Sequence, residues 1–271
     1  MIQVMSLRKC MSNFNTIFTK RKGFVAFMAY GYPSIEASEK LIEVMAQNGV
    51  DLIEIGIPFS DPTAEGAVIA DANEIALKNG INTDKIFESL ARVRKQCSVN
   101  LSFMTYANVV FSYDKERFIA QMRELEMNAL ILPDVPFEEK GEFDGECRAN
   151  GVDLISFIAP TSVDSADRMA RIVREARGFI YCVSSLGVTG MRDNVGGGVR
   201  EIVERIREIR DDIPVAVGFG ISNAQKAREI AEFADGIIIG SAIVKLCGEK
   251  GYLQKVGAFV KEVREALDGA K

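Results

Sequence analysis

The feature that most constrains this chain is a repeated alternation of short apolar runs and longer segments with helical spacing. The apolar runs have the length of β-strands, and eight of them occur, at residues 24–30, 52–57, 101–106, 129–132, 154–159, 179–183, 215–217 and 236–240. Each gap is long enough for a helix that crosses over to a parallel strand. This pattern predicts an α/β fold, a (β/α)8 TIM barrel.

Length and continuity agree with a single barrel domain over residues 1–271. The fold typically takes about 250 residues, and no linker rich in proline, serine or glycine divides the 271 residues present. A doubly wound open sheet is the alternative architecture. It gives no reason for glycine turns to follow the last two predicted strands.

Local signals position several helices and loops. Ser34 is placed to cap a helix, and residues 200–210 combine an apolar face with a charged face that we expect to be solvated. The glycine triplet at 196–198 predicts a loop end. We expect an extra N-terminal helix before the first strand, preceded by a poorly ordered extension at residues 1–11.

Composition excludes several classes of function. The formal net charge of −5 provides no basic excess to bind nucleic acid or anionic lipid. Five widely spread cysteines form no zinc-site spacing, and we expect reduced thiols in a cytoplasmic protein. The N-terminus lacks the apolar core of a signal peptide, and no apolar run is long enough to span a membrane. We therefore expect no metal, no nucleic acid and no membrane partner.

Histidine is absent, which narrows the catalytic mechanisms open to the chain. Ser-His-Asp and Cys-His nucleophiles and imidazole proton shuttles are excluded. Acid–base chemistry must then come from carboxylates, tyrosine, lysine or cysteine. Barrel enzymes place such groups at the carboxyl ends of the strands.

Glycine-rich turns follow the last three predicted strands, at residues 187–190, 217–222 and 240–241. A short helical segment, 242–247, comes after the third turn. Backbone N–H groups without a neighbouring Cβ, together with a helix N-terminus, suit a phosphate dianion. Glycines that only make tight turns are the alternative, but three such turns where barrels often bind phosphate favour a phosphate site.

Glu54 lies inside an apolar strand, where a carboxylate is costly unless it is paired or catalytic. Burial would raise its pKa toward neutrality, which suits general acid–base catalysis. A structural, salt-bridged carboxylate is the alternative. Asp61 and Glu65 in the next loop fit either chemistry or a solvated turn, and Tyr106 fits either a hydroxyl donor or an aromatic of the barrel layer.

Six segments occur in the order and at the spacings found in tryptophan synthase α subunits, so the chain resembles that family from Asn13 onward. They are GIPFSDPTAEG, MTYAN, PDVP, YCVSSLGVTG, VGFGIS and GSAIVK. The P-F-S-D-P and G-V-T-G loops are the most specific of them. The resemblance implies a lyase of tryptophan biosynthesis, which cleaves indole-3-glycerol phosphate to indole and glyceraldehyde 3-phosphate by a retro-aldol reaction.

The resemblance also implies roles for individual residues. Glu54 would protonate indole C3 and act as the base toward the glycerol hydroxyl, while Glu65 would accept the indole N–H. The indole pocket would be lined by Phe27, Tyr106 and Phe219. The phosphate would rest on Gly190, Gly220, Gly240 and Ser241, with Tyr181 nearby.

A protein partner is implied as well. The family works as an αββα complex, which passes indole through a tunnel to a β subunit that holds pyridoxal phosphate. The resemblance therefore implies a β-subunit partner and no cofactor in this chain. The residues that would face the partner are Asp61, Pro62, Asn108 and Pro136.

Three positions depart from the family's pattern: Glu65 replaces an aspartate, Ala67 a proline and Ala70 a glutamine. The departures motivate a second hypothesis, a catalytically weakened barrel that mainly binds and activates the β partner. Under the first hypothesis, that of an active lyase, we expect the loop to have adjusted so that Glu65 still meets the indole N–H. Such an adjustment is open to the backbone because Ala67 lacks proline's fixed φ. A third hypothesis, another phosphosugar barrel such as an isomerase, leaves P-F-S-D-P and G-V-T-G unexplained.

Overall fold

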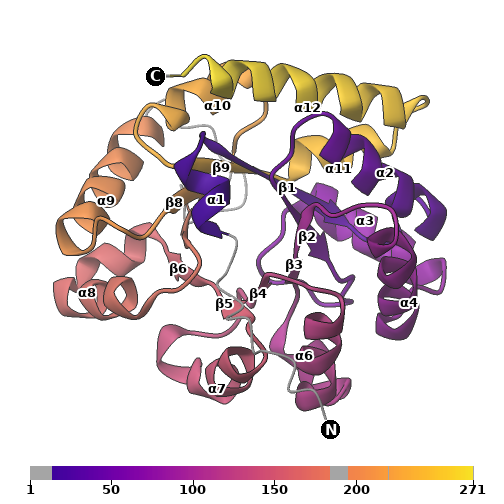
Figure 1. The fold of residues 1–271 in the computed structure, drawn as a ribbon, viewed down its shortest axis with the longest axis horizontal. Helices are drawn as coiled ribbons and strands as arrows, with labels where there is room; N and C mark the ends of the chain where they lie inside the picture. Colours follow the sequence, from indigo (N-terminus) through magenta and orange to yellow (C-terminus); the bar gives the residue numbers. More distant parts are fainter. Residues whose placement is uncertain (1–13, 184–194, 219, 271) are drawn as a thin grey trace, which may run out of the picture.

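The strands of the computed structural model, which describes residues 14–183, 195–218 and 220–270, form one parallel sheet that curves into a barrel (Figure 1). Neighbouring strands follow the order β5-β4-β3-β2-β1-β9-β8-β7-β6. The strands are β1 (Gly23–Ala29), β2 (Leu52–Gly56), β3 (Asn100–Met104), β4 (Ala129–Ile131), β5 (Asp153–Leu154), β6 (Ser156–Ile158), β7 (Ile180–Val183), β8 (Val215–Gly218) and β9 (Gly236–Ile239).

The barrel closes within the fifth predicted strand. β5 pairs with β4, while β6 pairs with β7 on the opposite side. Ile155, between β5 and β6, donates its backbone N–H to the carbonyl of Leu130 at 3.0 Å. The predicted strand 154–159 is thus divided into two short strands that serve opposite neighbours. The predicted TIM barrel is confirmed, because the eight predicted runs account for the nine strands that the described residues form.

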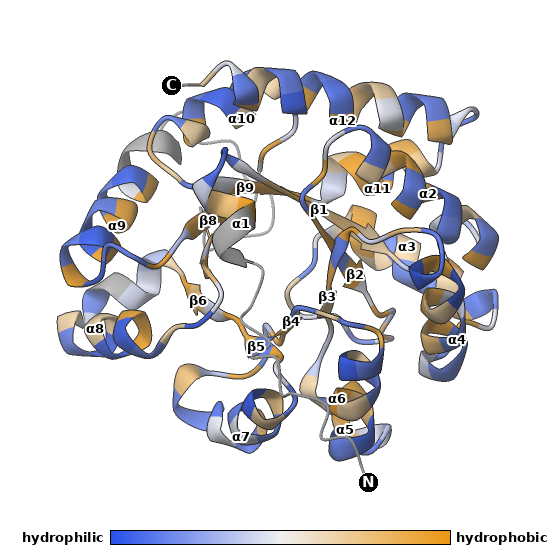
Figure 2. Ribbon diagram, in the orientation of Figure 1, coloured by the Kyte–Doolittle hydropathy of each residue, from blue (hydrophilic) through white to orange (hydrophobic). Residues whose placement is uncertain are grey.

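Helices surround the barrel in Figure 1, and their outward faces are hydrophilic in Figure 2. As predicted, Ser34 caps the first helix after β1, since its Oγ accepts from the Ala37 N–H at 3.1 Å. The helices that follow strands are α2 (Ile35–Gln47), α3 (Ala67–Lys78), α4 (Thr83–Arg94), α5 (Ala107–Ser112), α6 (Lys115–Glu124), η1 (Phe137–Glu139), α7 (Gly141–Ala149), η2 (Pro160–Asp164), α8 (Ala166–Glu175), α9 (Val195–Ile209), α10 (Ala224–Ala231), α11 (Ser241–Cys247) and α12 (Tyr252–Asp268).

The glycine triplet at 196–198 lies in the first turn of α9, so the prediction of a loop end there was wrong. Glycine costs only about 1 kcal/mol per residue relative to alanine in a helix. The buried side chains of Ile202, Val203 and Ile206 further along α9 pack against the sheet and stabilise the helix as a whole.

Side chains of the strands alternate between the barrel interior and the layer beneath the helices. On β1, Val25, Phe27 and Ala29 belong to the interior cluster, whereas Phe24 and Met28 pack with residues of the surrounding helices. This alternation has the period of two that parallel strands impose. It decides which polar side chains of the strands face the centre of the barrel.

The predicted extra N-terminal helix is α1 (Phe14–Thr19), which packs at the amino end of the strands. The Phe18 ring lies 5.4 Å from the ring of Phe179, centroid to centroid. A Cβ at Gly23 would come within 2.4 Å of the Phe18 ring, so glycine makes this close approach possible. Residues 1–11 lie outside the described residues, and the single-domain assignment stays a prediction.

Candidate active site

The Glu54 carboxyl lies in the barrel interior. In the strand register Glu54 stands between Phe27 of β1 and Ser102 of β3. Its side chain is 0% exposed, and neither carboxyl oxygen has a hydrogen-bond partner among the described residues. Burial raises the pKa of Glu54 to about 8, because the ionised form would lose its water. The carboxyl therefore carries a proton near neutral pH, and the described part of the chain offers no salt bridge for it.

Tyr181 of β7 faces the same interior. Burial raises its pKa well above the usual value, and the nearby Glu54 charge raises it further. Its ring lies 4.9 Å from the ring of Phe157, and a Cβ at Gly218 would come within 2.6 Å of it. Tyr181 is therefore a neutral hydroxyl side chain, in place close to Glu54.

Glu65 is held by Tyr106 at the carboxyl end of β3. The Tyr106 hydroxyl donates to Oε2 of Glu65 and accepts from the backbone N–H of Ala64 at 3.0 Å. The Phe59 ring packs on Tyr106 with 4.9 Å between centroids. Burial raises the pKa of Glu65, and the hydrogen bond from Tyr106 opposes that effect. Tyr106 thus anchors both the carboxyl and the backbone of the β2–α3 loop.

Ala67 is the first residue of α3, after Gly66 as the N-cap. Proline is favoured at this first helical position, because its fixed φ already suits the helix. Alanine and proline therefore both fit this backbone. The Glu65 carboxyl itself is bound by the hydroxyl of Tyr106.

The predicted indole and phosphate residues that the structure describes lie in the barrel interior or directly after the strands β3, β8 and β9. Phe27 is buried in the interior, and a Cβ at Gly240 would lie 3.3 Å from its side chain. Gly220 has a φ of +77° with nothing within 4 Å of where a Cβ would be. Ser241 is the exposed first residue of α11. The other two predicted residues, Gly190 and Phe219, lie outside the described residues.

The four predicted partner-facing residues lie in segments that follow three neighbouring strands. Asp61 and Pro62 lie in the loop after β2, Asn108 lies in α5 after β3, and Pro136 precedes η1 after β4. Asp61, Asn108 and Pro136 are exposed, and Pro62 is half-buried. Asp61 accepts a hydrogen bond from the Ser60 hydroxyl at 2.6 Å. The four residues thus occupy one sector of the barrel rim.

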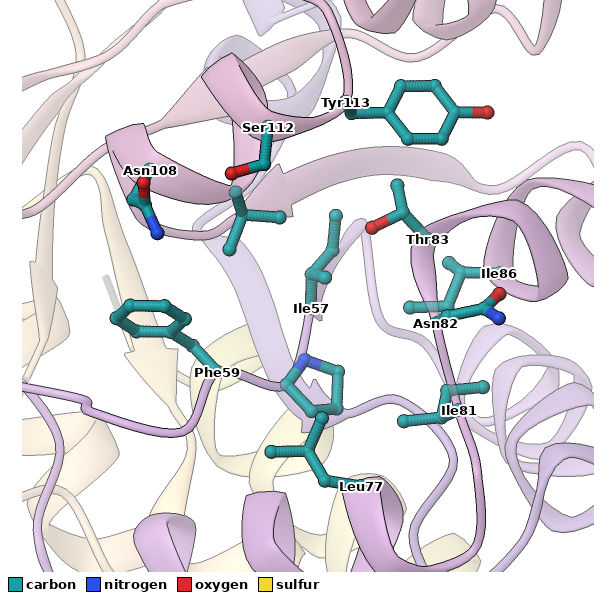
Figure 3. A pocket seen from close by; sticks show the side chains of 12 residues that line it. Ile57, Phe59, Leu77, Ile81, Asn82, Thr83, Ile86, Asn108, Ser112 and Tyr113 are labelled. Carbon is teal, nitrogen blue, oxygen red and sulfur yellow. The ribbon is translucent and has the colours of Figure 1, made fainter.

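A cavity of about 300 Å³ opens beside this sector, with Phe59 and Asn108 on one side and Ile86 and Tyr113 on the other (Figure 3). It is lined by α3, α4 and α5, outside the barrel. Neither Glu54 nor Glu65 lines it. The cavity is therefore separate from the two carboxyls.

Sequence reasoning missed three buried polar side chains near the site: Asn73, Ser102 and Thr105. Each has an oxygen without a hydrogen-bond partner in the described residues. A polar residue within an apolar strand, the signal that identified Glu54, was also present for Ser102. Asp134 was missed too, although it fixes the start of α5 by accepting from the Ala107 N–H at 3.0 Å.

No metal centre was found: the described residues contain no group of three or more His, Cys, Asp or Glu side chains able to hold an ion. Nor does any helix in the described ranges have the length and apolar character needed to cross a membrane.

The chain is similar to known proteins over most of its length. The family profile described as tryptophan synthase alpha chain matches residues 14–268. The tryptophan synthase alpha chain of Dehalococcoides mccartyi is 39% identical over 258 residues, 95% of this chain and 100% of the relative. That of Lactiplantibacillus plantarum is 41% identical over 260 residues, 96% of this chain and 97% of the relative.

Solved structures give the same result. Tryptophan synthase subunit alpha from Campylobacter jejuni superimposes with a TM-score of 0.84 at 34% identity, covering 93% of this chain and 99% of that one. A chain of Mycobacterium tuberculosis tryptophan synthase gives a TM-score of 0.87 at 30% identity, covering 95% and 99%. The barrel and the sequence match together establish that the chain belongs to the tryptophan synthase alpha chain family.

Proposed function

We propose that this chain is a lyase of tryptophan biosynthesis that cleaves indole-3-glycerol phosphate to indole and glyceraldehyde 3-phosphate. The observation that carries the proposal is the Glu54 carboxyl, fully buried and unpaired among the described residues, with its pKa raised to about 8. A carboxyl that holds a proton at neutral pH is an acid able to protonate carbon, and the chain has no histidine for that task.

Glu54 serves both proton transfers of the retro-aldol reaction. Its neutral carboxyl gives a proton to indole C3, which converts the ring to an indolenine-like cation. The resulting carboxylate takes the proton of the glycerol hydroxyl on the carbon attached to C3. As the C3–carbon bond breaks, its electrons return to the ring, indole is released, and the hydroxyl carbon becomes the aldehyde. Glu54 ends the cycle protonated, as it began.

Glu65 stabilises the positive charge that the ring acquires. Its carboxylate accepts the indole N–H, so that the cation forms next to a negative charge instead of in an apolar cavity. The hydrogen bond from Tyr106 supports this role, because it favours the ionised form of Glu65. The two acids thus have separate tasks, which their different surroundings support.

The glycine turns hold the phosphate and the aromatic residues hold the indole. Gly190, Gly220, Gly240 and Ser241 provide neutral backbone donors and the N-terminus of α11. The left-handed φ of Gly220 supports this arrangement, since a residue with a Cβ is strained there. Phe27, Tyr106 and Phe219 enclose the ring, and Tyr181 lies near the phosphate.

The partner is a β subunit in an αββα complex, and pyridoxal phosphate belongs to that subunit, with none in this chain. The complex operates in the cytoplasm. The position of Asp61, Pro62, Asn108 and Pro136 after three neighbouring strands supports one continuous interface. Replacing Asn108 with arginine should weaken binding of the β subunit, measured by sedimentation as a smaller fraction of the complex. The matched change at Gln225, an exposed residue after β8, should not.

Replacement of Glu54 with glutamine tests the catalytic proposal. General acid–base catalysis is worth about 10²–10⁴-fold, so this variant should fold and lose nearly all release of indole from indole-3-glycerol phosphate. Glu54→Asp is the matched control, because it keeps an acid and should retain part of the activity. If Glu54→Gln kept more than about a tenth of the turnover, Glu54 would be structural.

The same assay separates the active lyase from the weakened barrel that the departures at Glu65, Ala67 and Ala70 suggested. Turnover is measured with and without the β subunit. An active lyase releases indole in both cases, and faster with its partner. A chain that activates the partner but releases no indole itself would contradict the proposal.

A further inference from the structure

Ser102 of β3 is a polar side chain of the barrel interior that has no part in the steps above. It is 0% exposed, and its Oγ has no hydrogen-bond partner in the described part of the chain. The strand register places it directly beside Glu54. Adjacent strands lie about 4.8 Å apart, so the two side chains leave neighbouring backbone positions on the same face of the sheet.

Two buried polar groups without partners in neighbouring positions call for a physical explanation. At least about 90% of buried polar groups in proteins have a hydrogen-bond partner. The Glu54 carboxylate is an acceptor without a donor, and the Ser102 hydroxyl is a donor that can rotate toward it. On the other side of Glu54, the register places Phe27, whose ring offers no hydrogen-bond donor.

We propose that Ser102 is a positioning residue whose hydroxyl donates a hydrogen bond to the Glu54 carboxylate and orients it during the interval in which Glu54 has given up its proton. This inference rests on the proposed catalytic function of Glu54. The bond stabilises the ionised form of Glu54 at the moment when that carboxylate must find the glycerol hydroxyl.

The hydroxyl also matches Glu54 to its double task. A group that both gives and takes a proton works best when its pKa lies near the working pH. Burial favours the neutral carboxyl and raises the pKa of Glu54. A hydroxyl donor acts in the opposite direction, because it favours the carboxylate. Ser102 therefore limits the effect of burial while leaving the interior uncharged.

The other titratable side chains of the described interior do not depend on the Ser102 hydroxyl for a hydrogen bond. Tyr181 of β7 senses the Glu54 charge. Asp153 of β5 occupies the same side of the sheet two strands beyond Ser102 and pairs with Arg177 at 3.4 Å. Glu65 and Tyr106 pair with each other at the carboxyl end of the barrel. A shift in the titration of Glu54 on removing the Ser102 hydroxyl thus reports on that hydroxyl.

The experiment compares Ser102→Ala, Ser102→Thr and the control Ser89→Ala. Ser89 is equally buried but bonds Tyr30 on the helix side of the sheet, at 2.7 Å. Two quantities are followed against pH: kcat/KM, and the infrared carboxyl band that Glu54→Gln abolishes. We expect Ser102→Ala to raise the titration midpoint of Glu54 by about one pH unit and to lower kcat by about tenfold. Ser102→Thr should restore the midpoint, and Ser89→Ala should leave it unchanged.

An unchanged or lowered midpoint in Ser102→Ala would overturn the inference, as would an equal shift in Ser89→Ala. Either result leaves the role of Glu54 standing. Full activity in Glu54→Gln instead refutes the proposed function itself, whatever the Ser102 variants do. The two failures are therefore distinguishable.

Discussion

Shortening Glu65 to aspartate tests whether its carboxyl works from the position that Tyr106 holds. The change withdraws the carboxyl by one C–C bond, about 1.5 Å. It thereby breaks the hydrogen bond that the Tyr106 hydroxyl donates to Glu65. Because a displacement of about 1 Å can cost on the order of 10²-fold in rate, we expect kcat/KM of Glu65→Asp to fall by about 10–10²-fold.

Tyr106→Phe removes the same hydrogen bond from the other side and keeps the ring against Phe59. A hydrogen bond to a charged group contributes about 1.5–3 kcal/mol, which corresponds to about 10–10²-fold. The two changes act on one contact, so the double variant should lose little beyond Glu65→Asp alone. Glu65→Gln should be worse than either, because an amide cannot stabilise the ring cation with a negative charge.

The assay is release of indole from indole-3-glycerol phosphate by the purified chain, repeated with the β subunit. Ala67→Pro is the matched control, since proline fits the first residue of α3 and should leave kcat/KM nearly unchanged. Additive losses in the double variant would show that Tyr106 does not act through Glu65. A faster Glu65→Asp would favour the weakened barrel, and full activity in Glu65→Gln would remove Glu65 from the chemistry.

Three further predictions concern Glu54 and the phosphate. Since Glu54 must start protonated, kcat/KM should decline as the pH rises through about 8, and a decline only below pH 5 would contradict this. The pKa of Glu54 in the folded state lies above the ordinary glutamate value of 4.5, so the neutral Glu54 carboxyl contributes stability that is full below pH 4.5 and lost as the pH rises through about 8. Glu54→Gln should therefore melt at a higher temperature than the unmodified chain at pH 8 but not at pH 4; equal melting at both would refute it. Gly220→Val should weaken binding of substrate and of glycerol phosphate alike in calorimetry. Valine is strained at the φ of +77° that Gly220 adopts, so the change displaces the backbone N–H proposed to bind the phosphate. Unchanged binding would place the phosphate site elsewhere.

The barrel itself was predictable from sequence, because each apolar run has strand length and each gap can hold a helix. Strand ends differ from the predicted ones by a residue or two, as hydrogen-bond patterns decide them. The division of strand 154–159 was not predictable. It arises because Ile155 bonds to Leu130 while Ser156 already pairs with Ile180, and such a change of neighbour leaves no mark on hydropathy.

Within the site, Glu54 was predictable for a related reason. A charged residue in an apolar strand signals burial whatever the fold, and the structure gives it no ion pair within the described residues. The contact between Glu65 and Tyr106 was not predictable, since it depends on how the loop after β2 folds back over the end of β3. Sequence separation says nothing about that path. The glycine triplet at 196–198 predicted a loop end but lies in a helix, because packing of α9 outweighs the low helix propensity of glycine.

A chain without histidine must obtain two carboxyls of different proton affinity from their surroundings alone, and this barrel supplies two kinds of surroundings. Its closed interior places Glu54 between an aromatic ring and a small hydroxyl side chain, with no charge beside it in the register, so desolvation keeps it neutral. Its rim leaves Glu65 half-buried and gives it a tyrosine donor, so a negative charge costs less there. The depth of each residue in the barrel therefore decides which carboxyl gives a proton and which keeps its charge. For the same reason, an extra methylene at Glu65 is tolerable on the rim, where a loop can adjust, whereas an extra methylene at Glu54 would meet packed strands on both sides.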